Sequence, residues 1–200
     1  VFGAEAGLSV VQISTFVSAF FVGSMLLQYP IGWLSDRMDR RVLIFSAALI
    51  CGLGGVLGFL LGGFYPMLLV SAFAIGGMSN PLYSLLIAYT NDFLEHDDMA
   101  AAAGGMVFIN GLGAVAGPLI TGWIMEVVGP QGFFLFIAVL MLTMAGYAAY
   151  RMTQRAAPSV AETESYAPVV ASATPVAVEF AQEYAIETAQ EDEESTAAGS

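Results

Sequence analysis

Long apolar runs alternate with short polar breaks along the first three quarters of the chain. We place five runs near residues 12–33, 43–62, 67–90, 104–127 and 132–150. About 20 apolar residues let a helix cross the hydrocarbon core of a bilayer. Each run should be a helix, because hydrocarbon cannot satisfy an open backbone, and the runs lack the alternation of barrel strands. The pattern therefore predicts an all-α membrane protein with five transmembrane helices in residues 1–155.

Composition supports a membrane protein and isolates the acidic charge in one segment. The chain is 58% hydrophobic and 11% charged, whereas soluble domains are about a quarter charged. Residues 156–200 hold nine of the 17 acidic residues and no basic one, so the net charge of −12 is mostly a property of this segment. Its Ala, Glu, Ser, Thr and Pro content predicts a disordered tail. A short helix around Glu179, Glu183 and Glu187 is the alternative, but like charges at this spacing oppose it.

The basic residues predict the orientation. The chain has no lysine, and its five arginines follow the first and the fifth span: Arg37, Arg40, Arg41, Arg151 and Arg155. Threading five spans brings both groups to the same side, and the positive-inside rule makes that side cytoplasmic. We therefore expect a multi-pass protein of the cell inner membrane with a cytoplasmic C-terminal tail.

The sharpest motif lies between the first two spans and reads Gly32-Trp33-Leu34-Ser35-Asp36-Arg37-Met38-Asp39-Arg40-Arg41. A glycine there lets helices approach closely. An acid followed by clustered arginines at a helix junction can form ion pairs and interact with helix dipoles. The alternative is that the arginines serve only to fix the orientation of the loop.

This motif resembles the G-x-L-[AS]-D-R-x-G-R-[KR] signature of the major facilitator superfamily. The matching residues are Gly32, Leu34, Asp36, Arg37, Arg40 and Arg41. Asp39 replaces the usual second glycine, which suits the weaker copy in the second half of such proteins. The resemblance implies that Gly32, Asp36, Arg37, Arg40 and Arg41 form a gate on the cytoplasmic side.

Two further spans strengthen the resemblance, which we expect to cover about residues 1–150. The fourth span holds Gly113 and Gly117 at G-x-x-x-G spacing, followed by Pro118, and we expect these three residues to allow close helix packing. The third span carries Asn80-Pro81-Leu82-Tyr83-Ser84-Leu85, followed by Asn91-Asp92. This stretch resembles the tenth helix in a group of poorly characterised bacterial permeases.

The resemblance places the chain within a larger protein. It implies five helices of a six-helix half, and the terminal tail favours the second half, with helices eight to twelve, over the first. The chain begins at Val1 rather than Met, so we expect a fragment whose N-terminal half is missing. In this superfamily each half consists of inverted three-helix repeats, and substrate binds near the midplane between the halves.

Polar residues within the spans are the candidates for contact with substrate: Gln28, Ser79, Asn80, Tyr83 and Asn110. A polar residue in a membrane helix usually faces the protein interior or a water-filled cavity. The alternative is that each one bonds to a neighbouring helix. No ionisable residue lies deep in any span, so a proton-coupling acid would belong to the missing part.

Signatures of enzymes are absent. The sequence has no metal-spaced cluster, nucleophile elbow or phosphate loop. We therefore expect no catalytic residues, metal or cofactor, and no nucleic-acid partner. The expected partners are the lipid bilayer, the missing half and an unknown small solute.

The predicted function is secondary active transport of that solute by alternating access. The alternatives are a non-transporting scaffold or sensor module whose tail recruits a partner and, more remotely, a membrane-embedded enzyme.

Overall fold

The computed structural model describes residues 2–93 and 99–154, and the expected tail lies outside these residues. A short helix, α1 (Phe2–Glu5), precedes five long ones. These are α2 (Val10–Ser35), α3 (Arg40–Leu61), α4 (Tyr65–Asn91), α5 (Met99–Val128) and α6 (Gly132–Gln154). All five are long and apolar enough to cross a membrane, which confirms the predicted fold class. We call the end of the bundle where α2 ends and α3 begins the inner end.

Local sequence signals begin several of these helices. Ser9 and Gln12 form a capping box at the start of α2, in which each side chain accepts a hydrogen bond from the backbone N–H of the other. Asp39 caps α3 by accepting a hydrogen bond from the backbone N–H of Arg41 at 2.9 Å. Pro66 lies in the first turn of α4, where its missing N–H costs nothing.

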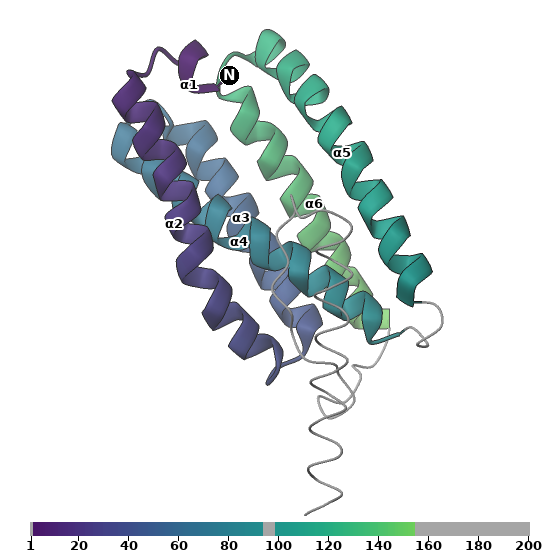
Figure 1. The fold of residues 1–200 in the computed structure, drawn as a ribbon. Helices are drawn as coiled ribbons and strands as arrows, with labels where there is room; N and C mark the ends of the chain where they lie inside the picture. Colours follow the sequence, from purple (N-terminus) through teal and green to yellow (C-terminus); the bar gives the residue numbers. More distant parts are fainter. Residues whose placement is uncertain (1, 94–98, 155–200) are drawn as a thin grey trace, which may run out of the picture.

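The packed core is formed by α2, α3, α4 and α6, with α4 against both α2 and α3, and α3 against α6. Figure 1 shows α2 and α5 on opposite sides of the bundle, with the other long helices between them. Polar bonds support the packing. The Ser71 hydroxyl of α4 donates to the Gly54 carbonyl of α3 at 2.6 Å, and the Tyr65 hydroxyl donates to the Gln12 carbonyl of α2 at 3.0 Å.

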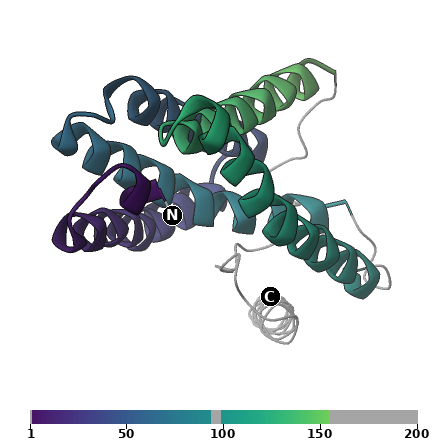
Figure 2. The same cartoon turned by 90° about the horizontal axis from the view of Figure 1, so that it is seen from above.

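Glycines allow the closest helix approaches. A Cβ added to Gly55 of α3 would lie 2.8 Å from the backbone nitrogen of Ala138 in α6. A Cβ added to Gly76 of α4 would collide with the Phe20 carbonyl of α2. The view from above in Figure 2 shows α2 and α4 running side by side. At both contacts, a residue larger than glycine would keep the two helix backbones farther apart.

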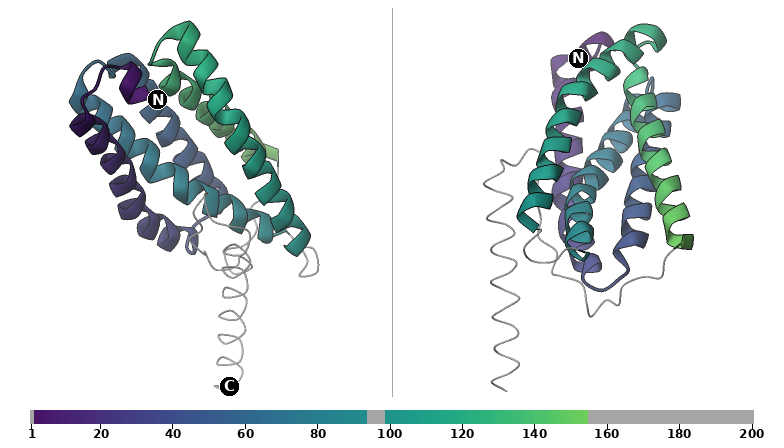
Figure 3. Two further views of the ribbon diagram at one scale, coloured as in Figure 1. Left: turned by 45° about the horizontal axis from the view of Figure 1, so that its top comes forward. Right: turned by 90° about the vertical axis from the view of Figure 1, so that its right-hand side faces the viewer.

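Helix α5 differs from the rest because it lies largely outside the core. It contacts mainly α6 near the α5–α6 turn, and the left view in Figure 3 shows it on the opposite side of the bundle from α2. A Cβ added to any of its glycines would meet nothing within 4 Å, and this includes Gly113 and Gly117. The close packing expected at Gly113, Gly117 and Pro118 therefore does not occur among the described residues, and it stays a prediction about a helix from elsewhere.

Candidate functional site

The motif that joins α2 to α3 forms a polar cluster at the inner end. Gly32 and Ser35 are buried in the last turn of α2, and Asp36 is its C-cap. Residues 36–39 make the turn, and Arg40 and Arg41 open α3. The short turn therefore brings all five predicted gate residues to one end of the bundle.

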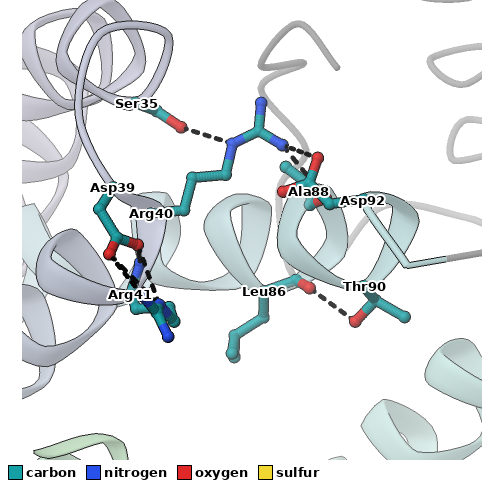
Figure 4. A network of polar contacts seen from close by, with 8 residues as sticks. All are labelled: Ser35, Asp39, Arg40, Arg41, Leu86, Ala88, Thr90 and Asp92. Carbon is teal, nitrogen blue, oxygen red and sulfur yellow. Dashed lines mark hydrogen bonds and ion pairs between the residues drawn. The ribbon is translucent and has the colours of Figure 1, made fainter. Parts of the chain in front are cut away.

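Arg40 of α3 lies at the centre of this cluster, where its side chain bonds to α2 and to the end of α4. Its guanidinium donates to Asp92 Oδ1 at 2.5 Å, to the Ala88 carbonyl at 3.2 Å and to Ser35 Oγ at 3.3 Å (Figure 4). The Arg40 and Asp92 side chains are each only 2% exposed. Ala88 lies in the last turn of α4, where the helix dipole favours a cation. One buried arginine thus joins the end of α2, the start of α3 and the end of α4.

Arg41 makes a different, more superficial pair. Its Nη2 atom lies 2.9 Å from Asp39 Oδ2, and the two side chains are 11% and 27% exposed. Partial burial raises the pKa of Asp39, but hydrogen bonds from the side chain and backbone N–H of Arg41 outweigh this effect. The net pKa of Asp39 therefore lies below its ordinary value, and the carboxylate stays ionised at neutral pH.

The remaining charged residues of the motif are exposed. Arg37 donates to the Trp33 carbonyl at 3.1 Å, and its guanidinium carbon lies 4.2 Å from the centre of the Trp33 ring. Asp36 presents an exposed side chain at the C-terminal end of α2. The motif therefore has a buried part, Arg40, and an exposed part, Asp36 and Arg37.

The candidates for substrate contact lie farther along the spans. Asn80 of α4 donates to the Ser24 hydroxyl of α2, so it bonds to a neighbouring helix, as the alternative interpretation holds. Ser79 donates to the Gly76 carbonyl of its own helix at 3.4 Å. Gln28 is partly buried one turn beyond Ser24. Of these three candidates, Asn80 links two helices, through its hydrogen bond from α4 to Ser24 of α2.

Tyr83 and Asn110 lie on α4 and α5. Tyr83 packs against Ile87, which also contacts Met106 and Val107 of α5. Asn110 is partly buried about one turn farther along α5. The five candidates therefore lie on α2, α4 and α5, and their contact with substrate stays a prediction.

Sequence reasoning missed Asp92, Ser35 and Ser24 as partners of the site. Asp92 had a usable signal, because it begins the acidic stretch 92–98 and the threading places that stretch on the same side as the arginines. Ser35 also had a local signal, because it lies in the motif five residues before Arg40. Ser24 had none, because which face of α2 meets α4 depends on tertiary packing.

Comparison with known proteins agrees with the motif and with the fold. The sequence profile of the Major Facilitator Superfamily matches residues 1–185. The match extends to residue 185, whereas we expected the resemblance to end near residue 150.

Proteins of similar sequence include an uncharacterized MFS-type transporter, YfkF, of Bacillus subtilis. It is 32% identical over 70% of this chain and 36% of its own length. Inner membrane protein YqcE of Escherichia coli is 28% identical over 62% of this chain and 29% of its own length.

The uncharacterized MFS-type transporter YcaD of Salmonella arizonae is 23% identical over 66% of this chain and 34% of its own length. The chain spans about a third of the length of these relatives. With five membrane-length helices among the described residues, the motif between α2 and α3 and a profile match over most of its length, the chain belongs to the major facilitator superfamily.

Proposed function

We propose that the chain is the C-terminal part, helices eight to twelve, of a secondary transporter that moves a small solute across the inner membrane by alternating access. The observation that carries this proposal is the division of the motif into a buried arginine and an exposed acid. Arg40 joins three inner helix ends, so they move as one body. Asp36 lies exposed beside them at the inner end, where we expect the other half to approach when the inner side closes.

The exposed acid suits a contact that exists in only one state. A carboxylate at the inner end can accept hydrogen bonds from the N-terminus of a helix in the other half, where the dipole favours negative charge. Closing the inner side makes this contact and opening it breaks the contact. An interaction present in one state only shifts the balance between the two states.

The surface of α5 supports a partner half. Its glycines, Gly104, Gly105, Gly111, Gly113, Gly117 and Gly122, leave open space around the helix. Small residues are typical of helix–helix interfaces in membranes. We propose that the N-terminal half packs there and supplies the opposite wall of the substrate site.

The alternative is a non-transporting scaffold or sensor with a partner-recruiting tail. Uptake of labelled solutes into proteoliposomes distinguishes the two. We expect uptake by the complete protein and none by the 200-residue chain alone, because five helices cannot enclose a midplane site. Absence of uptake for every solute class tested, with the protein correctly inserted, would favour the scaffold. Robust uptake by this chain alone would contradict the division into halves.

A further inference from the structure

A second site, lined mostly by apolar surface and by two arginines, lies at the inner end between α3, α4 and α6. It is a partly open cavity of about 310 Å³, near the lower end of the roughly 300–1,000 Å³ typical of ligand pockets. We call it the inner pocket. It is lined by Arg41, Ile44, Leu86, Tyr89, Met144, Tyr147, Ala148 and Arg151. None of these residues belongs to the buried Arg40 network.

The lining separates charge from apolar surface. Arg41 is the second residue of α3, and Arg151 lies in the last turn of α6, so both cations are at the inner end. Ile44, Leu86 and Met144 lie one or two turns deeper into the spans. The pocket is therefore cationic at its mouth and apolar behind it.

Its position matches a membrane surface. Arginines near helix ends extend toward the interface, where tyrosines are also enriched. Tyr147 is 61% exposed at the pocket edge, and Tyr89 is partly buried in the wall. A ligand that reaches both kinds of surface must be amphipathic. A free phosphate would contact only the arginines and would leave the apolar wall uncovered.

The local charge balance indicates the headgroup. Asp39 forms its ion pair with Arg41 and offsets one of the two positive charges at the mouth. The balance of Arg41, Arg151 and Asp39 is therefore one positive charge. A single phosphodiester group neutralises it.

We propose that the inner pocket binds one anionic phospholipid of the phosphatidylglycerol type. Its phosphate lies between Arg41 and Arg151, and the start of one acyl chain lies along Ile44, Leu86 and Met144. Basic pockets between membrane helices are suited to anionic headgroups.

Native mass spectrometry of the complete 200-residue chain, in a non-ionic detergent, tests this proposal. Phosphatidylglycerol and phosphatidylcholine with identical acyl chains are the probes. We expect preferential retention of phosphatidylglycerol and no displacement by excess inorganic phosphate. Equal retention of both lipids would overturn the proposal, and displacement by inorganic phosphate would show a simple anion site instead.

Variants separate the pocket from general charge. Arg151→Gln should weaken phosphatidylglycerol binding by about fivefold, the effect of one basic residue near an anionic membrane surface. Arg37→Gln removes the same charge from the inner end outside the pocket, so it should leave binding unchanged. An equal loss in both variants would reduce the effect to net charge and overturn the proposal.

A third variant and a peptide complete the test. Ala148→Leu keeps the charge but narrows the pocket, and it should weaken binding at unchanged helix content. Unchanged binding would show that the apolar wall takes no part. A peptide of residues 179–194 should not displace the lipid. Displacement by this acidic peptide would assign the pocket to the C-terminal segment of the chain instead.

Discussion

Replacing Asp92 by asparagine should destabilise the chain by about 3 kcal/mol. The substitution keeps the shape of the side chain and removes its charge, so the buried Arg40 loses its counter-ion. Breaking a buried ion pair on one side typically costs about 3–5 kcal/mol. The lower end applies here because Arg40 keeps its bonds to the Ala88 carbonyl and Ser35 Oγ, and the new amide oxygen can still accept.

The second ion pair provides a matched control. Asp39→Asn removes a charge from the Arg41 pair, whose side chains are 11% and 27% exposed, compared with 2% for both residues of the Arg40 pair. Asparagine is also a good N-cap, so the start of α3 is preserved. An ion pair contributes less the nearer it lies to solvent, down to about 0–1 kcal/mol when it is exposed, so this variant should lose less stability than Asp92→Asn.

Equilibrium unfolding in mixed detergent micelles, followed by circular dichroism, measures both effects. The double variant Arg40→Met/Asp92→Leu should recover most of the lost stability, because apolar residues of similar volume often replace a buried pair without cost. Equal losses for Asp92→Asn and Asp39→Asn would refute the argument from burial. A loss in the double variant as large as in Asp92→Asn would show that the charges themselves are not what matters.

Three further predictions concern topology, packing and the tail. In a Cys51→Ala background, an impermeant maleimide added to intact cells should label Gly63→Cys but not Met38→Cys, and the reverse pattern would invert the orientation. Gly55→Val should lower the stability of the chain by about 1–3 kcal/mol, because its Cβ meets the α6 backbone. Gly113→Val should leave the stability of the chain alone unchanged but should destabilise the complete protein. A loss of stability from Gly113→Val in the chain alone would contradict this account of α5. Deleting residues 158–200 should leave insertion and transport by the complete protein near normal, and loss of transport at unchanged expression would reveal a function of the tail.

The helices were predictable because each depends on a local property. Hydropathy alone located all five, and the motif located the α2–α3 turn. The observed helices are longer than expected at most ends, because capping residues such as Ser9 lie beyond the apolar run. The division into a membrane region and a tail from residue 156 stays a prediction.

The contacts between helices were much less predictable. The sequence indicated Gly113 and Gly117 as packing glycines, yet among the described residues it is other glycines, such as Gly55 and Gly76, that meet neighbouring backbones. Glycine spacing shows that close approach is allowed, but not which helix will be there. The Arg40–Asp92 pair joins residues 52 positions apart, and only the arrangement of α3 against α4 brings them together.

Distances between the two halves test alternating access most directly. In the complete protein, one spin-label pair would join residue 38 to the inner end of the other half, and another would join residue 63 to its outer end. We expect two populations. In one, the inner distance is long and the outer distance is short; in the other, the inner distance is short and the outer distance is long. Removing a helix-terminus contact of about 0.3–2 kcal/mol by Asp36→Asn should shift the population ratio toward inward-open by roughly two- to thirtyfold. A single distance at each end, unchanged by solute and by Asp36→Asn, would contradict the account.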